Sequence, residues 1–278
     1  MSCGRITIAG LFIEWNGSEW MDIFNIKLSD LTIEVRSRFD YCRHFCCDYL
    51  TDKDIPDFSV YAEDDRLDEL RTYSPEMPDE YLERDAIYSA IASKLPYHDR
   101  VALHGACISY KDKAYLFTAA SGTGKSTHIG LWKRYLGDDV GIINGDKPIF
   151  HVRDDGSIRA YDTPWCGKEG WNQMKSANMA GICFLKRGEK NKIRPMEPDE
   201  AISLMLRQMF HPYEEESTGL MLGLFDEILS RLPLWLLECD ISEEAVKLSF
   251  EALTGEKYVR SDKETSYEEI NKMWRMKR

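Results

Sequence analysis

The amino-acid sequence predicts an α/β protein, α+β overall, in which a smaller β-rich N-terminal region precedes a domain built on a mixed β-sheet. Three observations support this fold class. Short alternating apolar segments fill the N-terminal region, strand-like and helix-like segments follow one another from Val101 onward, and a glycine-rich turn joins one of these strands to a helix. A chain of 278 residues has the length of one large domain or two smaller ones.

The N-terminal region is predicted to span residues 1–78. Within it, the apolar residues of Ile6–Ile13 and Asp22–Val35 alternate as in short antiparallel strands, whereas Phe39–Leu50 fits either a helix or a strand. The acidic segment Asp64–Leu70 is expected to begin a helix. Two prolines close the region, because the residue before a proline avoids helical geometry.

The main domain is predicted to span residues 79–258, followed by a charged C-terminal tail over residues 259–278. It begins with a helix over Asp79–Leu95, which Pro96 ends. Three β-hairpins are expected, each with a turn that contains Gly, Asp or Lys: Ala106–Tyr110 with Ala114–Thr118, Ile149–Arg153 with Ile158–Tyr161, and Gly181–Lys186 with Lys192–Met196. Further helices are expected over Pro198–Phe210, Leu220–Leu232 and Glu243–Leu253.

Composition and charge exclude several classes of protein. Lys and Arg number 36 against 48 Asp and Glu, and this net charge of −12 argues against a non-specific nucleic-acid-binding protein. No apolar run reaches the roughly 18–20 residues that span a bilayer, and the N-terminus lacks a signal-peptide pattern. Eight scattered cysteines do not resemble a secreted disulfide framework. We therefore expect a cytoplasmic protein that binds neither nucleic acid nor membranes; the sequence is compatible with a homo-oligomer as well as a monomer.

The segment Ala119–Thr127 matches the pattern of a phosphate-binding loop, except that alanine occupies its first position. Glycines let successive amides curl around phosphate oxygens, and the helix that follows directs its positive end at the anion. Lys125 supplies a cation for the β- and γ-phosphates, and Ser126 supplies a hydroxyl for Mg²⁺. We predict that a nucleotide binds to these residues of the loop: Ser121, Gly122, Thr123, Gly124, Lys125, Ser126 and Thr127.

A histidine is expected at the mouth of this loop. If Lys111–Lys113 forms a tight hairpin turn, His104 lies opposite Ala119 or Ala120. From there its imidazole can orient or tune a nearby acidic group. The alternative interpretation is a histidine that belongs to the core of the hairpin.

Two aspartates end predicted strands of the main domain. Asp146 follows the strand Val140–Asn144, and ligands of open α/β sheets bind at the carboxyl ends of strands. An aspartate there reaches Mg²⁺ or accepts the proton of a hydroxyl group, although a turn aspartate before Pro148 is the plainer alternative. Asp162 ends another strand and competes for either role. Lys168 and Arg187 are candidate contacts to a substrate phosphate or carboxylate, whereas exposed cations commonly face solvent.

Together, His104-Gly105, the hairpin, the loop Ser121–Ser126 and Asp146 after the next strand resemble the catalytic domain of the HPr kinase/phosphorylase family. That family's P-loop fold is similar to phosphoenolpyruvate carboxykinase. The resemblance covers Val101–Phe210 and implies a P-loop mixed β-sheet kinase domain. It implies that ATP and Mg²⁺ bind and that the γ-phosphoryl group passes to a serine hydroxyl. The family's catalytic base and its assisting histidine correspond to Asp146 and His104, while Lys125 and Ser126 correspond to its phosphate and metal contacts.

The chain also departs from that family. Gly145 stands where the family has a second aspartate, so Asp162 is an alternative metal ligand. The chain resembles more closely the shorter HPr-kinase-like proteins, some of which phosphorylate serine in a modified peptide or as a free amino acid. This resemblance implies a serine-containing peptide, protein or small molecule as acceptor, with Thr163–Gly170, including Trp165, as a substrate-side loop. Gly145 keeps open a different function: a nucleotide-binding regulator or scaffold, or an ATPase, associated with peptide modification but without phosphotransfer.

Overall fold

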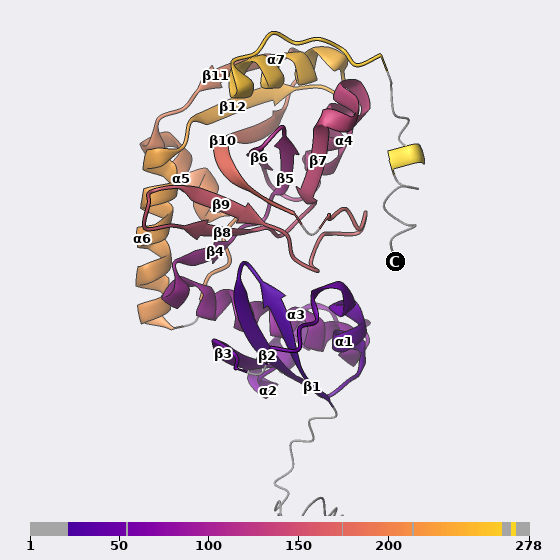
Figure 1. Ribbon diagram of the computed structural model, residues 1–278, viewed down its shortest axis with the longest axis vertical. Coiled ribbons are helices and arrows are strands. Elements are labelled where there is room, and N and C mark those ends of the chain that lie inside the picture. The colour runs from indigo at the N-terminus through magenta and orange to yellow at the C-terminus, as the bar shows by residue number, and fades with distance from the viewer. Residues whose placement is uncertain (1–21, 54, 174, 213, 263–267, 271–278) are drawn as a thin grey trace, which may run out of the picture.

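The structure is a computed structural model, and it describes residues 22–53, 55–173, 175–212, 214–262 and 268–270 (Figure 1). The predicted strand Ile6–Ile13 lies outside the described residues. The described part is mixed α/β, with about 39% helix and 29% strand in mixed sheets, which confirms the predicted fold class at this level. No described helix has the length and apolar character needed to cross a membrane.

The N-terminal region contains a three-stranded sheet covered by helices (Figure 1). The sheet has the order β1-β2-β3; β1 and β2 form an antiparallel hairpin and β3 runs parallel to β2. The elements are β1 (Asp22–Leu28), β2 (Leu31–Ser37), α1 (Tyr41–Phe45), η1 (Cys47–Tyr49), β3 (Phe58–Tyr61), α2 (Asp64–Tyr73) and α3 (Asp79–Lys94). The antiparallel strands predicted within Asp22–Val35 are confirmed, and Phe39–Leu50 is helical in its centre.

Helix α3 packs in the core of this sheet, and the same cluster also includes Ala102 and Ile149 of the main domain. Leu82, Ala86, Ile87 and Ile91 recur at helical spacing, and they are buried in the same hydrophobic cluster as the inward side chains of β1 and β2. The short helix η2 (Leu95–His98) then leads into the main domain. The helix that begins the predicted main domain therefore contributes its apolar face to the N-terminal core.

The main domain is built on a nine-stranded mixed sheet. Its strands are β4 (Arg100–Ala102), β5 (Ala106–Tyr110), β6 (Lys113–Thr118), β7 (Val140–Asn144), β8 (Ile149–Val152), β9 (Ile158–Tyr161), β10 (Ser176–Arg187), β11 (Lys192–Pro195) and β12 (Leu234–Cys239). The order is β4-β8-β9-β10-β6-β5-β7, and β12 pairs with both β10 and β11. Strands β6, β10 and β12 are parallel, and β7 runs in the same direction because two antiparallel pairings separate it from β6. Their carboxyl ends therefore lie at one edge of the sheet.

Helices cover both faces of this sheet. Tyr115 and Phe117 of β6 pack in one cluster with α4 (Lys125–Leu136) and α7 (Glu243–Thr254). Leu116 points the other way and joins the cluster of α5 (Pro198–Leu206) and α6 (Glu215–Arg231). Figure 1 shows α4 and α7 at the upper side of the domain and α6 along its left side. In the predicted tail, residues 268–270 are helical and Ile270 is buried in the α4–α7 cluster.

The predicted hairpin between Gly181–Lys186 and Lys192–Met196 is wrong. Strand β12 lies between β10 and β11, parallel to the first and antiparallel to the second. The apolar side chains Leu234 and Leu237 are buried when β12 takes this position. A direct β10–β11 hairpin would leave no place between the two strands in which they could be buried. The other two predicted hairpins, β5–β6 and β8–β9, are confirmed.

Candidate functional site

The glycine-rich loop joins β6 to α4 at the edge where the parallel strands end, which is the predicted context. Gly122 and Gly124 have φ of 76° and 121°, a region that side-chain-bearing residues rarely adopt. A Cβ at either position would meet nothing within 4 Å, so these glycines serve the backbone conformation rather than a close contact. Gly124 is also the N-cap of α4 and no side chain caps that end, which leaves the first amides of the helix directed at the loop.

Two cationic side chains, Lys125 and Arg187, donate hydrogen bonds to backbone carbonyls of the loop. Lys125 is 7% exposed, and its Nζ donates a hydrogen bond to the carbonyl of Ala119 across 2.9 Å. Burial lowers the pKa of Lys125, against the opposing effect of the negative charge on Asp146. Arg187, at the end of β10, donates from Nε to the carbonyl of Thr123 (3.1 Å) and from Nη2 to that of Gly122. Arg187, predicted to contact substrate, therefore lies on the loop backbone.

A cavity of about 680 Å³ lies beside the loop. The loop glycines, the first turns of α4 and the carboxyl ends of β10 and β12 form its walls. Leu131, Leu185 and Ile241 give one part of its wall an apolar surface, which suits an aromatic base, and charged side chains line the rest. The wall from β12 could not be expected from the sequence, because that strand was not predicted.

Asp146 and His104 face each other next to the loop. The register of the β5–β6 hairpin pairs Ala106 with Phe117 and thereby brings His104 level with Ala119, as predicted. His104 Nε2 lies 3.3 Å from Asp146 Oδ1, and Lys147 Nζ contacts the second carboxylate oxygen. Burial alone would raise the pKa of Asp146, but the hydrogen bonds and charges of His104 and Lys147 lower that pKa to about 2.

The backbone and a glutamine fix this pair in place. The amide of Gly105 donates to the carbonyl of Asp146 (2.8 Å), and the amide of His104 donates to that of Gln208 (2.7 Å). His104 Nδ1 lies 3.1 Å from Gln208 Oε1. A Cβ on Gly105 would stand 2.5 Å from Leu116 Cδ1, so glycine is needed for the backbone to approach β6 this closely. The sequence carried no signal for Gln208, which lies beyond α5.

Asn144, which sequence reasoning missed, orients the segment that carries Asp146. Its Oδ1 accepts hydrogen bonds from the amides of Asp146 (2.8 Å) and Lys147 (2.7 Å). Its Nδ2 donates to Asp162 Oδ1 (2.9 Å), and Tyr49 donates to Asp162 Oδ2 (2.6 Å). The available signal was an asparagine directly before Gly-Asp, a residue type that often bonds the backbone two residues ahead.

Asp162, the alternative ligand or base, is 5% exposed and its carboxylate faces this hydrogen-bond network. Its role as a metal ligand stays a prediction. No further carboxylate fits beside Asp146 at position 145, since a Cβ on Gly145 would stand 2.8 Å from the carbonyl oxygen of Cys166. The close packing of the 163–170 loop thus explains the glycine in physical terms.

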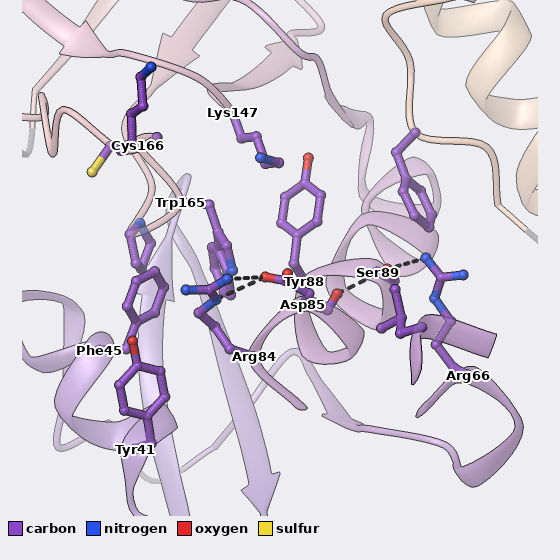
Figure 2. A pocket seen from close by; sticks show the side chains of 15 residues that line it. Tyr41, Phe45, Arg66, Arg84, Asp85, Tyr88, Ser89, Lys147, Trp165 and Cys166 are labelled. Carbon is purple, nitrogen blue, oxygen red and sulfur yellow. Dashed lines mark hydrogen bonds and ion pairs between the residues drawn. The ribbon is translucent and has the colours of Figure 1, made fainter. Parts of the chain in front are cut away.

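The 163–170 loop lies against Asp146. Gly167 has φ of 80°, and a Cβ there would stand 3.1 Å from Asp146 Cβ. Trp165 and Lys168 of this loop, with Lys147, line a second cavity of about 620 Å³ (Figure 2). Trp165 and Lys168 therefore lie with Lys147, the residue after Asp146, around this second cavity. Arg187 lines the cavity beside the glycine-rich loop instead.

Among the described residues, no group of three or more His, Cys, Asp or Glu side chains is arranged to hold a metal ion. A nucleotide-bound Mg²⁺ needs fewer protein ligands, because phosphate oxygens and waters supply the rest. Ser126 in the first turn of α4 and Asp146 are suitable oxygen donors for such an ion.

No protein-family model matches this chain, and no curated protein matches it either. The resemblance to HPr kinase/phosphorylase stays a prediction from the sequence.

Proposed function

We propose that this chain is an ATP-dependent kinase that transfers the γ-phosphoryl group to a serine hydroxyl of a peptide, protein or small-molecule acceptor. One observation carries the proposal: the loop lysine, Lys125, follows β6, and Asp146, with His104 3.3 Å from its carboxylate, follows β7 at the same sheet edge. A carboxylate alone would serve a nucleotide-binding protein as an Mg²⁺ ligand, but the histidine that supports Asp146 favours a role as base.

In this proposal, the loop amides and Lys125 hold the β- and γ-phosphates, and the cavity beside the loop receives the base against Leu131, Leu185 and Ile241. The positive end of α4 adds to the attraction for the phosphates. Ser126 and one carboxylate would hold Mg²⁺, which when bound neutralises charge on the phosphate oxygens. Arg187 stabilises the conformation of the loop by donating hydrogen bonds to the carbonyls of Gly122 and Thr123.

The transfer step needs positioning and charge stabilisation more than covalent chemistry by the protein. The acceptor oxygen forms a bond to the γ-phosphorus while the bond from that phosphorus to the β–γ bridging oxygen breaks, and ADP leaves with the electron pair. The hydroxyl proton passes to the carboxylate of Asp146. Its pKa of about 2 keeps Asp146 ionised at neutral pH, ready to accept the hydrogen bond of the hydroxyl. His104 orients this carboxylate through the contact between its Nε2 and Asp146 Oδ1.

A second candidate function is a nucleotide-binding regulator or scaffold, or an ATPase, without phosphotransfer. The observation in its favour is the carbonyl of Cys166, which leaves no room for a side chain at position 145 and hence for a second carboxylate.

Incubation with γ-labelled ATP and Mg²⁺ separates these functions. The kinase proposal predicts label in a serine-containing acceptor, the ATPase alternative predicts label in inorganic phosphate only, and a regulator predicts neither. Binding of ATP without transfer to any acceptor, peptide or small molecule, would favour the second candidate.

A further inference from the structure

The cavity of about 620 Å³ on the Asp146 side is formed by both parts of the chain. The N-terminal region contributes side chains of α1, α2 and α3, and the main domain contributes Lys147, the 163–170 loop and Phe210. Figure 2 shows Lys147 and the hydroxyl of Tyr88 directed toward one another across its upper part. We call this cavity the acceptor pocket; its volume suits a small organic molecule or a few residues of a peptide.

The acceptor pocket opens next to Asp146. Lys147 lines it and contacts the Asp146 carboxylate, and Gly167, also in its wall, packs on the same side chain. Tyr88 lies on the same side of the pocket, because Lys147 Nζ stands 5.7 Å from the centroid of its ring. The wall of the pocket therefore reaches the Asp146 side chain through Lys147 and Gly167.

The charge of the pocket is opposite to that of the whole chain. Four cationic side chains line it against one carboxylate, Asp85, although the chain carries a net charge of −12: Arg66, Arg84, Lys147 and Lys168. Arg66 is paired with Glu69 at 2.6 Å, Arg84 with Asp85 at 2.8 Å and Lys147 with Asp146, whereas Lys168 makes no ion pair within the described part of the chain. The charge of Lys168 therefore favours an anionic group.

Aromatic rings form the floor of the pocket. The ring of Trp165 lies 5.6 Å from that of Phe45 and 5.3 Å from that of Tyr88, between centroids, and Phe210 lies 6.1 Å from Tyr88. The guanidinium of Arg84 lies 5.3 Å from the Phe45 ring, which holds its charge over the aromatic surface. Such a surface binds an apolar group beside the anionic one.

We propose that the acceptor pocket selects a hydroxyl compound that also carries a carboxylate and an apolar group. This inference rests on the proposed function, because it assigns the acceptor of the same transfer. Lys168 binds the carboxylate, the rings of Trp165 and Phe45 contact the apolar group, and the hydroxyl reaches Asp146. An acidic peptide and a small hydroxy acid both present this chemistry, and the experiment distinguishes them.

The test uses three heptapeptides with one central serine and one phenylalanine, in which the serine is flanked by two glutamates, two glutamines or two lysines. N-acetylserine is the small-molecule probe. Binding of each fluorescently labelled peptide to the full chain is measured without nucleotide, and transfer from γ-labelled ATP is measured separately. N-acetylserine is followed by transfer and by competition with the labelled glutamate peptide.

We expect the glutamate peptide to bind at least about tenfold more tightly than the lysine peptide, the size of one favourable charge contact. Lys168→Gln is expected to reduce that preference severalfold and to leave the glutamine peptide unaffected. Lys192→Gln, which removes an exposed cation from β11, is the matched control and should change nothing. Stronger transfer to N-acetylserine than to the glutamate peptide would assign the small hydroxy acid.

The two proposals can fail separately. Selective binding of the glutamate peptide that depends on Lys168, without label transfer, would support the pocket and contradict the kinase function. Equal binding of the three peptides, or no binding of any peptide or of N-acetylserine, would overturn the acceptor assignment, even if label transfer to serine occurs.

Discussion

The hydroxyl of Tyr49 donates a hydrogen bond to Oδ2 of Asp162 over 2.6 Å, and this contact joins the N-terminal region to the candidate site. Burial and the charge of Asp162 raise the pKa of Tyr49, so the tyrosine remains a donor. Asp162 in turn accepts from Asn144, and Asn144 accepts from the amide of Asp146. The position of the proposed base therefore depends on a residue more than ninety positions earlier in the chain.

Replacing Tyr49 by phenylalanine tests this chain of contacts. Tyr49→Phe removes one donor to a buried carboxylate, and we expect a loss of about 1–3 kcal/mol in the free energy of unfolding. We also expect a severalfold lower kcat for transfer with unchanged nucleotide affinity. Urea denaturation and initial-rate kinetics measure the two effects, and Tyr73→Phe, at an exposed tyrosine of α2, is the control. A Tyr49→Phe variant with wild-type stability and kcat would show that the contact has no such role.

Asp146→Asn separates binding from transfer. The asparagine cannot accept the hydroxyl proton, so we expect kcat to fall by about 10²–10⁴-fold, the usual contribution of a positioned base. Nucleotide binding depends on the loop amides and Lys125 and should persist. Asp112→Asn, in the turn between β5 and β6, controls for the loss of one negative charge. Full turnover by Asp146→Asn would assign the base to another residue.

Gly167→Ala tests the contact of the 163–170 loop with Asp146. An alanine at φ of 80° costs about 1–2 kcal/mol. Its Cβ would also press on Asp146, and a small displacement of a catalytic group lowers the rate by about tenfold or more. Gly219→Ala is the matched control, because its Cβ would meet nothing within 4 Å in α6 and should stabilise that helix slightly. Equal transfer rates in both variants would mean that the loop does not position Asp146.

His128 makes the stability of the domain depend on pH. It is buried in α4, with its Nε2 3.1 Å from Ser249 Oγ, and burial lowers its pKa from 6.5 to about 3. Between these pH values the unfolded chain binds a proton that the folded chain does not. Stability therefore falls as the pH decreases from 6.5 toward 3, by up to about 1.4 kcal/mol per pH unit from this group.

The corresponding experiment compares the slope of unfolding free energy against pH between 6.5 and 4.5, from urea denaturation. We expect a shallower slope in His128→Gln than in the wild type, whatever the stability lost at pH 7.5. His211→Gln, at an exposed histidine, should keep the wild-type slope. Parallel curves for wild type and His128→Gln would contradict the assignment.

The local parts of the candidate site could be predicted because neighbouring residues encode them. The tight turn after Tyr110 sets the register of β5 and β6, and that register brings His104 to Ala119. Gly122 and Gly124 mark the positions of positive φ, and the apolar strand before Asp146 places it at the edge of the sheet.

The features that could not be predicted depend on contacts between residues far apart in the sequence. The order of β10, β12 and β11 is set by the burial of Leu234 and Leu237 against residues some fifty positions earlier, which no local pattern contains. In the sequence, Gly145 suggests only that a carboxylate is absent. In the structure, the carbonyl oxygen of Cys166 leaves no room for a side chain at this position. The acceptor pocket likewise forms only where the N-terminal region packs against the main domain, and no local sequence pattern predicts that packing.

The central claim is that the loop at Gly122–Lys125 binds the phosphates of a nucleotide. Titration calorimetry with ATP or ADP in the presence of Mg²⁺ tests it most directly, with thermal unfolding measured alongside. We expect saturable heat of binding, a higher Tm with nucleotide, and loss of both in Lys125→Ala but not in Lys192→Ala. No heat and no thermal protection of the wild type with either nucleotide would contradict the claim.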